Sequence, residues 1–223
     1  VIGLTPSLKR ESLRVPIGSA TRDGIDIHTS ILDFNDYDYS PKFNIVTGSV
    51  LDHQSLYDCF TNYGKVSSVI LAFGGNPNVV GNNMLSHGTL NVLNYMRHKN
   101  CKKITAVTSV GIKESYYQAP NFFRNRIDTI YKEVFADKSN QEYFLEKSDT
   151  SWCIVRPGGL TFDAPKKYVD FVPLQDKIGT ISRADLAGFC LRSVTDPEFG
   201  FFGKKISISN DNFDLPAPPL IRV

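Results

Sequence analysis

Two hydroxyl side chains, Thr108 and Ser109, end an apolar run at residues 104–109 that is rich in β-branched residues. Such a run is typical of a β-strand, and ligands of open α/β sheets bind beside the carboxyl ends of the strands. A hydroxyl there can donate a hydrogen bond to a carbonyl or accept one from an amide. Ser109 is therefore our first candidate for an active-site residue, with Thr108 beside the ligand. The alternative is that Ser109 caps a helix or a turn.

A second candidate contact follows the apolar run at residues 66–73. Phe73 ends this run, and Gly74 and Gly75 come directly after it. Glycines let the backbone or sugar of a ligand approach the chain closely, because they have no side chain. We expect all three residues to contact a ligand, and the alternative is a plain tight turn.

Metal and disulfide chemistry are not supported by the cysteines and histidines. No two of the four cysteines have the CxxC spacing of a metal or redox site, and the histidines lie on separate segments. Cys153 and Cys190 stand in apolar runs and are predicted to be buried thiols. The residues concerned are Cys59, Cys101, Cys153 and Cys190, with His53, His87 and His98.

The candidate residues must be positioned by alternating strands and helices. Apolar, β-branched runs bounded by Gly, Pro, Asn or Asp predict strands at residues 1–4, 45–50, 66–73, 104–109 and 152–156. Between them lie stretches of helical period, marked three or four residues apart by Leu85, Gly88, Val92 and Met96 and by Ile130, Val134, Lys138, Glu142 and Leu145. Strands that are apolar at consecutive positions are covered on both faces. The pattern predicts a doubly wound parallel sheet of the α/β class.

Length and composition indicate a single domain over residues 1–223 with one hydrophobic core. Residues 11–44 form a long polar connection rich in Asp and Tyr, which we expect on the surface. Residues 210–223 carry several prolines and predict an extended tail that docks on a neighbour or stays free.

Charge and hydropathy narrow the class of protein. The net charge is only +2 and both signs are mixed along the chain, so no nucleic-acid partner is expected. No apolar stretch is long enough to span a membrane, and the first residues do not resemble a signal peptide. We expect a soluble, cytoplasmic protein that acts on a small molecule.

Three blocks, in this order and spacing, carry a resemblance to a known family. They are HGTLNVL at residues 87–93 with KITAVTSVG at 103–111, KSNQEYFL at 138–145 with WCIVRPG at 152–158, and ISRADLA at 181–187. Together they resemble the NAD(P)-binding, NmrA-like branch of the atypical short-chain dehydrogenases, and within it the biliverdin reductase B and flavin reductase proteins. The resemblance covers roughly residues 46–209, and residues 1–10 fit the second strand of that family and the turn after it.

The resemblance implies a Rossmann-like fold whose first strand and helix are missing from this sequence. In that fold a glycine-rich turn after the first strand holds the pyrophosphate of the cofactor at a helix N-terminus. No such turn precedes Val1, and the only internal candidate, residues 18–24, follows no convincing strand and lacks the third glycine. We expect an incomplete N-terminus; the alternative is a protein without a normal cofactor site.

The residues expected to hold the adenosine half of the cofactor favour NADP over NAD. Lys9 and Arg10 follow the strand where a basic residue pairs with the 2′-phosphate of NADP, although Pro6 stands in place of the family's usual arginine. The alternative is a solvated basic turn. Ser49 and Val50 lie in the turn that rests on the adenine in this family, with Ser49 replacing the usual acid.

The family's ordinary relatives use a Tyr-xxx-Lys pair, in which the tyrosine transfers the proton and the lysine binds ribose. Tyr143 and Lys147 have this spacing, but the register of the resemblance instead places the lysine at Lys138. Val134 then stands where the tyrosine would be. The resemblance thus implies that Lys138 and Ser109 position the cofactor and the substrate, and that the proton comes from solvent.

The chain after residues 152–156 is implied to shape the pocket for nicotinamide and substrate, through Pro157 and Gly158. Arg156 either joins this pocket or forms a structural ion pair with Asp185. A set of aromatic residues after residue 111 either forms a wall for a flat substrate or packs in the core. They are Tyr116, Tyr117, Phe122 and Phe123.

The resemblance therefore implies an NADPH-dependent reductase that delivers a hydride to a flat conjugated acceptor such as a flavin, biliverdin or a quinone. No metal is expected. The alternative is a regulatory protein of the NmrA type, which senses the cofactor or does without it and binds a protein partner.

Overall fold

The structure, a computed structural model, describes residues 2–5, 14–16, 29–31, 44–74, 83–211 and 221–222. The chain forms two compact units, Val1–Val66 and Ser67–Val223, and each is described by itself. The single domain over residues 1–223 stays a prediction. Lys9, Arg10, Gly75 and residues 18–24 lie outside the described residues.

The first unit contains two pairs of strands and one helix. Strand β1 (Ile2–Thr5) pairs in parallel with β4 (Asn44–Thr47), and β2 (Arg14–Pro16) pairs with β3 (Thr29–Ile31) in antiparallel. Helix α1 (His53–Thr61) follows β4. The strands predicted at residues 1–4 and 45–50 are thus confirmed, while the predicted surface connection at 11–44 contains β2 and β3.

Asp52 caps the N-terminus of helix α1. The carboxylate of Asp52 accepts a hydrogen bond from the amide of Ser55 at 2.8 Å. A side chain at this position stabilises a helix because the first amides of a helix have no partner within it. Hydrogen bonds from the hydroxyl and from the amide of Ser55 lower the pKa of Asp52.

The second unit is built on a six-stranded sheet with the strand order β12-β9-β11-β7-β6-β5. The strands are β5 (Ser68–Leu71), β6 (Lys103–Val107), β7 (Ser151–Pro157), β9 (Tyr168–Phe171), β11 (Lys204–Ser209) and β12 (Ile221–Arg222). Strands β5, β6 and β7 are parallel, as predicted, and β11, which was not predicted, runs parallel to them. Strand β9 pairs in antiparallel with both of its neighbours, β11 and β12, which the sequence pattern did not predict either. A separate parallel pair joins β8 (Gly159–Thr161) to β10 (Thr180–Ser182).

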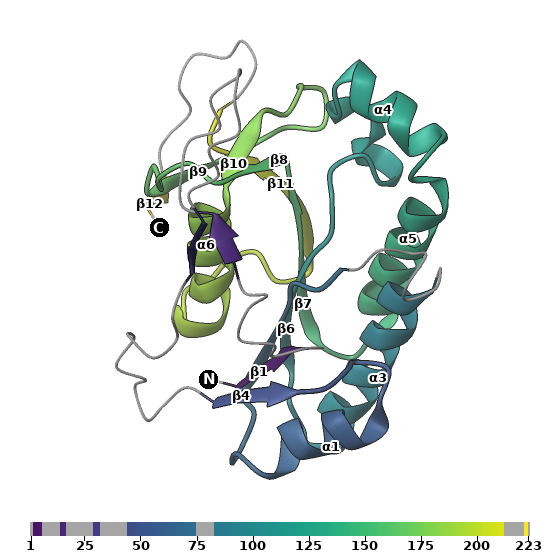
Figure 1. The fold of residues 1–223 in the computed structure, drawn as a ribbon, viewed down its shortest axis with the longest axis vertical. Coiled ribbons are helices and arrows are strands. Elements are labelled where there is room, and N and C mark those ends of the chain that lie inside the picture. The colour runs from purple at the N-terminus through teal and green to yellow at the C-terminus, as the bar shows by residue number, and fades with distance from the viewer. Residues whose placement is uncertain are drawn as a thin grey trace. The chain divides into compact units, whose positions relative to one another are not determined.

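Helices cover both faces of this sheet (Figure 1). Helices α3 (Met84–His98) and α5 (Lys132–Lys147) lie on one face, and α6 (Arg183–Thr195) lies on the other. The connection from β6 to α5 contains the short 3₁₀ helix η1 (Lys113–Gln118) and α4 (Asn121–Asp128). The helical face predicted from Leu85 to Met96 is buried in α3. Ile130 instead precedes α5 and is 74% exposed, so the prediction that it belongs to the face of that helix was wrong.

The end of the chain joins the sheet. Ile221 pairs with Val169 and Arg222 with Tyr168, so that the last described residues of the predicted tail at 210–223 extend the sheet beyond β9. Residues 212–220 lie outside the described residues.

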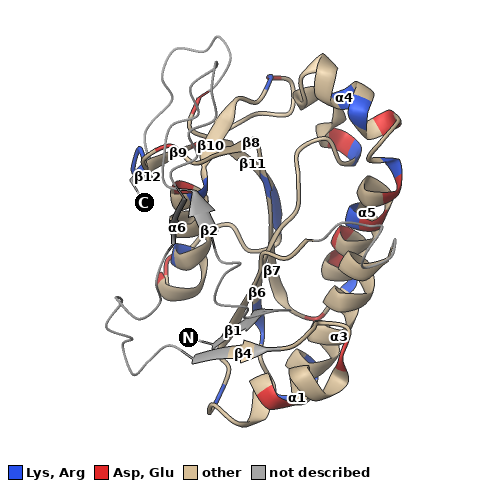
Figure 2. Ribbon diagram, in the orientation of Figure 1, with Lys and Arg blue, Asp and Glu red and all other residues tan. Residues whose placement is uncertain are grey.

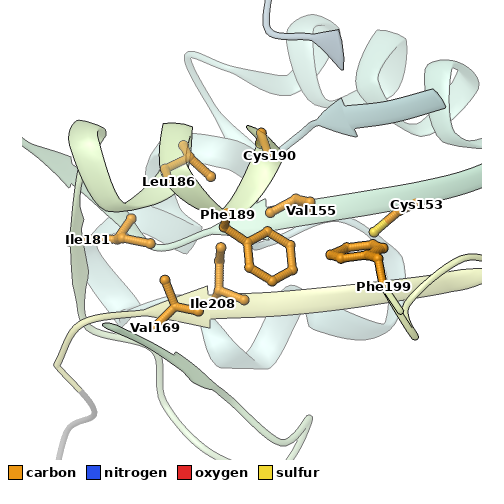
Figure 3. Packing of buried hydrophobic residues seen from close by; sticks show 9 residues of the cluster. All are labelled: Cys153, Val155, Val169, Ile181, Leu186, Phe189, Cys190, Phe199 and Ile208. Carbon is orange, nitrogen blue, oxygen red and sulfur yellow. The ribbon is translucent and has the colours of Figure 1, made fainter. Parts of the chain in front are cut away.

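The face of the sheet toward α6 holds an apolar core of nine buried residues. Phe189 lies at its centre, and side chains from β7, β9 and β11 surround it (Figure 3). Cys153 and Cys190 are buried free thiols, as predicted, and burial raises the pKa of each to about 12. The cluster consists of Cys153, Val155, Val169, Ile181, Leu186, Phe189, Cys190, Phe199 and Ile208.

Candidate functional site

The carboxyl end of β6 stays attached to β7 after the strand itself ends. The amide of Thr108 donates to the carbonyl of Val155 at 2.8 Å, and the amide of Val110 donates to the carbonyl of Pro157 at 3.3 Å. Thr108 is buried and Ser109 is half-buried between these two bonds. The backbone on both sides of Ser109 is therefore held against the neighbouring strand.

Lys138 reaches this strand end from α5. Its ammonium donates to the carbonyl oxygen of Thr108 at 3.4 Å. Burial lowers the pKa of Lys138 below that of an ordinary lysine, and the carboxylates of Glu142 and Asp137 oppose this shift. Val134 precedes Lys138 by one helical turn, so no tyrosine lies at that position of α5.

The hydroxyl of Ser109 donates to the carbonyl of Val110 at 2.9 Å. It caps neither η1 nor α4, which both begin without a hydrogen bond from a capping side chain. The turn that follows is instead stabilised by Ser115, whose hydroxyl accepts from the amide of Gly111 at 3.1 Å. The catalytic assignment of Ser109 and Lys138 stays a prediction, and the structure brings the two to the same strand end.

A buried ion pair lies directly beside Thr108. The guanidinium of Arg156 bonds Glu142 twice, from Nε to Oε1 at 2.9 Å and from Nη2 to Oε2 at 2.6 Å. The Arg156 side chain is 2% exposed and that of Glu142 is 0% exposed. The hydroxyl of Thr108 donates to the same Glu142 Oε1 at 2.8 Å. One carboxylate thus joins α5 to the ends of β6 and β7.

The proposed ion pair between Arg156 and Asp185 is wrong. Successive side chains of a strand point to opposite faces, and Val155 packs with Leu186 in the core on the α6 side. Arg156 therefore points away from α6. The carboxylate of Asp185 accepts instead from the amides of Lys166 and Lys167, each at 2.8 Å, and from the hydroxyl of Ser182 at 2.7 Å.

The ion pair extends into a network of alternating charge. Nη1 of Arg156 donates to Glu114 Oε1 at 2.9 Å, and Lys205 lies 3.1 Å from Glu114 and 3.3 Å from Glu146. Burial alone would raise the pKa of Glu114, but a backbone hydrogen bond and its bonds to Arg156 and Lys205 outweigh it and lower the pKa to about 2. The sequence reasoning used Glu142 only as a marker of register and missed Glu114 and Lys205. The signal available was Arg156, a charged residue in the apolar run at 152–156, which needs a buried partner.

A groove of about 460 Å³ lies beside this network. Glu114, Arg156 and Lys205 line its polar side, and residues 171–174 line its apolar side. Neither Ser109 nor Lys138 lines it, so the groove is separate from the predicted catalytic residues.

The predicted pocket residues after β7 have a structural role of their own. The amide of Gly158 donates to the carbonyl of Ile208 at 3.1 Å. A Cβ atom on Gly158 would collide with the carbonyl oxygen of Gly179, so glycine is needed there for the approach of the protein's own backbone. Pro157 ends β7 and is buried. Cofactor binding by Pro157 and Gly158 stays a prediction.

The remaining predicted cofactor contacts lie at strand ends in the two units. Gly74 is exposed after β5, and a Cβ atom there would have nothing within 4 Å, while Phe73 beside it is half-buried. In the first unit, the hydroxyl of Ser49 accepts from the amide of Leu51 at 3.1 Å in the turn before α1. Val50 is half-buried in the same turn. Cofactor binding by these residues stays a prediction.

The aromatic residues after β6 divide between the two predicted roles. Phe123 packs against Phe135 with ring centroids 5.9 Å apart, and Tyr116 is half-buried against the same cluster. Tyr117 and Phe122 are 69% and 68% exposed. Core packing therefore explains Phe123 and Tyr116. For Tyr117 and Phe122, a wall for a flat substrate stays a prediction.

Charged residues of both signs alternate along α4 and α5 (Figure 2). Within the ranges that the structure describes, no three potential metal ligands gather in one place. No helix in those ranges has the length and hydropathy needed to cross a membrane.

Comparison with known proteins places this geometry in a family. The sequence matches the NAD(P)H-binding family over residues 32–197. It is 30% identical over 95 residues to the oxidoreductase AgnL4 of Paecilomyces divaricatus, a stretch that spans 42% of this chain and 36% of that relative. The chain thus matches only about a third of the length of this curated relative.

Solved structures share the fold. ChuY of Escherichia coli, described as an anaerobilin reductase, is 20% identical with a TM-score of 0.62, over 78% of each chain. A short-chain dehydrogenase/reductase of Veillonella parvula in complex with NADP is 15% identical with a TM-score of 0.60, over 82% of this chain and 77% of that one. The family match covers most of the chain, and the TM-scores show that these structures share its fold. The chain belongs to the NAD(P)H-binding family.

Proposed function

We propose that the protein is an NADPH-dependent reductase that transfers a hydride to a flat conjugated acceptor such as a flavin, biliverdin or a quinone. The observation that carries this proposal is the contact of Lys138 with the Thr108 carbonyl beside Ser109, at the carboxyl end of a parallel strand. Ligands of open α/β sheets bind at this edge. The names of the relatives, an oxidoreductase, an anaerobilin reductase and a protein in complex with NADP, support the same class of reaction.

The residues at the strand ends of the second unit fit a dinucleotide. The ammonium of Lys138 carries three protons, and the Thr108 carbonyl at 3.4 Å accepts only one hydrogen bond from it. Ribose hydroxyls can accept the others. The open space beside Gly74 allows a sugar or phosphate to approach the end of β5.

The remaining contacts with the cofactor are proposed from the sequence alone. Lys9 and Arg10 would pair with the 2′-phosphate, which is why NADP is proposed over NAD. Ser49 and Val50 would contact the adenine, and Pro157 and Gly158 the nicotinamide.

When bound, the reduced nicotinamide supplies a hydride to the acceptor, which gains two electrons while the cofactor is oxidised. Lys138 orients the ribose, and the Ser109 hydroxyl donates a hydrogen bond to the cofactor amide or to a carbonyl of the acceptor. Because Val134 occupies the place of the proton-transferring tyrosine, the acceptor takes its proton from solvent. Acceptors whose reduced form is protonated readily by water suit such a site better than simple ketones.

Calorimetric titration of the protein with NADPH and with NADH tests the proposal, followed by absorbance assays of NADPH oxidation with each acceptor. We expect micromolar binding of NADPH, weaker binding of NADH, and oxidation with at least one flavin, biliverdin or quinone. Failure of both this chain and a form extended upstream by a glycine-rich strand, turn and helix to bind either nucleotide would reject the reductase and favour the regulatory alternative.

A further inference from the structure

We propose that the Glu142–Arg156 pair is a clamp that positions the segment bearing Ser109, and that Glu142 and Arg156 are positioning residues for the reaction. The segment runs from Thr108 to Glu114. The proposal rests on the proposed function for its effect on cofactor binding, while the clamp itself is a property of the structure.

Both ends of the segment are attached to the same ion pair. At its start, Thr108 donates its hydroxyl proton to Glu142 Oε1 at 2.8 Å. At its end, Glu114 accepts from Nη1 of Arg156 at 2.9 Å. Ser109 lies between these two attachment points. A change in the geometry of the pair therefore shifts the segment from both ends.

The same residues also set the position of Lys138. Lys138 and Glu142 are four residues apart in α5 and so lie on the same face of the helix. Lys138 contacts the carbonyl of Thr108, and Glu142 contacts its hydroxyl. Thr108 is thus held through its backbone and its side chain by successive turns of one helix.

Stability alone does not account for this arrangement. Removing two charges from water is costly, and replacing a buried ion pair by apolar residues of similar volume is often neutral or stabilising. The Glu142 and Arg156 side chains are almost completely buried. What apolar residues could not supply is the directed set of bonds to Thr108 and Glu114.

The test compares the single variant Arg156→Met with the double variant Glu142→Met/Arg156→Met. The single variant leaves a buried carboxylate without its main partner, and we expect strongly reduced resistance to urea. The double variant should recover most of that resistance but bind NADPH about tenfold more weakly than the unmodified protein. Recovery of both stability and affinity would overturn the proposal, because the pair would then be structural only.

A matched pair of conservative variants keeps the test independent of folding. Thr108→Val removes the hydroxyl that the clamp holds, and Thr105→Val removes a buried hydroxyl on the same strand that bonds Ser193 at 2.6 Å. We expect about a tenfold loss of NADPH affinity for Thr108→Val and no loss for Thr105→Val. Equal affinities for the two variants would contradict the clamp.

A spectroscopic measurement separates failure of the clamp from failure of the proposed function. In NMR spectra of protein with labelled threonine methyl groups, the Thr108 signal should move or broaden in the double variant while the Thr105 signal stays in place. This result supports the clamp even if the unmodified protein binds no NADPH. An unchanged Thr108 signal in the folded double variant would overturn it.

Discussion

The two faces of the sheet in the second unit are packed with different chemistry. Toward α6 the contacts are mostly between aromatic rings: Phe189 lies with ring centroids 6.0 Å from Phe171, 5.5 Å from Phe199 and 5.9 Å from Phe201. Figure 3 shows two of these rings, Phe189 and Phe199, together with aliphatic side chains between α6 and the strands. Burial of apolar surface of this kind stabilises the folded state but does not fix the orientation of the groups that are buried.

Toward α5, apolar side chains such as Leu145 and Ile154 are also buried, but hydrogen bonds and ion pairs are buried among them. Besides the clamp, the Gln118 amide donates to the carbonyls of Val172 and Pro173 at 3.0 and 2.9 Å, and the Asp137 carboxylate accepts from the first amides of α3. Each bond requires a particular orientation of both groups. The α6 face thus stabilises the fold mainly through apolar burial, whereas the directed bonds on the α5 face fix the positions of Ser109 and Lys138.

Loss of the central ring on the α6 face should have the largest effect on stability. Phe189→Ala removes the side chain around which the aromatic cluster packs, and we expect a loss of about 3–5 kcal/mol in the free energy of unfolding. Urea unfolding measures it, with Leu191→Ala as a control because Leu191 is 53% exposed on the same helix. The folded fraction should keep its NADPH affinity. A large loss of affinity would show that the two faces are not separable.

A smaller loss of stability is expected for Asp185→Ala at the start of α6. This change leaves the amides of Lys166 and Lys167 and the hydroxyl of Ser182 without their acceptor. We expect a loss of about 1–3 kcal/mol, measured by urea unfolding. Asp163→Ala is the control, because Asp163 is exposed in the connection between β8 and β9 that also contains Lys166 and Lys167. Cofactor affinity should again be unchanged, since Asp185 belongs to the α6 side.

The opposite pattern is expected for Lys138→Met on the α5 face. We expect NADPH affinity to fall about tenfold, which corresponds to about 1.4 kcal/mol. The free energy of unfolding should change little, because burial already disfavours the charged form of Lys138. Lys147→Met in the last turn of the same helix is the control for calorimetry. Unaltered affinity in Lys138→Met would remove the main support for the proposed site.

The smallest effect concerns the dependence of stability on pH. The pKa of Glu114 is lowered to about 2 in the folded protein, below the ordinary value of about 4.3. Its ionised form therefore stabilises the folded state fully above pH of about 4.3, and this contribution disappears as the pH falls toward 2. Urea unfolding of the unmodified protein and of Glu114→Gln should differ most near neutral pH and converge in acid. A constant difference would contradict this assignment.

Periodicity predicted the centre of the fold because the central elements are uniformly buried. The strands at residues 104–109 and 152–156 became β6 and β7, and the apolar spacing from Leu85 to Met96 became the buried face of α3. The antiparallel strands β9 and β12 were missed. Strand β9 has only four residues, one of them the charged Asp170, and β12 has only two, so neither gives a clear apolar run in the sequence.

The candidate site was predicted only as far as strand ends are recognisable from sequence. The position of Ser109 at the end of a strand could be read from the apolar run, whereas the joint role of Ser109 and Lys138 was implied by the resemblance to the family. Arg156 was assigned to the wrong carboxylate, because the partner of a buried charge depends on which face of the strand it occupies and which helix covers that face. Glu142 lies 14 residues before Arg156, and Asp185 lies 29 residues after it; neither separation indicates the pairing.

The close stacking of Gly158, Gly179 and Asp211 has a consequence for motion. A Cβ atom on Gly158 would collide with the carbonyl of Gly179, and one on Gly179 would collide with the carbonyl of Asp211. The amide of Gly159 donates to Gly179, and that of Asn210 donates to Thr180. Three stretches of backbone from distant parts of the sequence therefore share one junction. Deuterium should enter these amides slowly, and displacement of one of the three stretches should displace the other two with it.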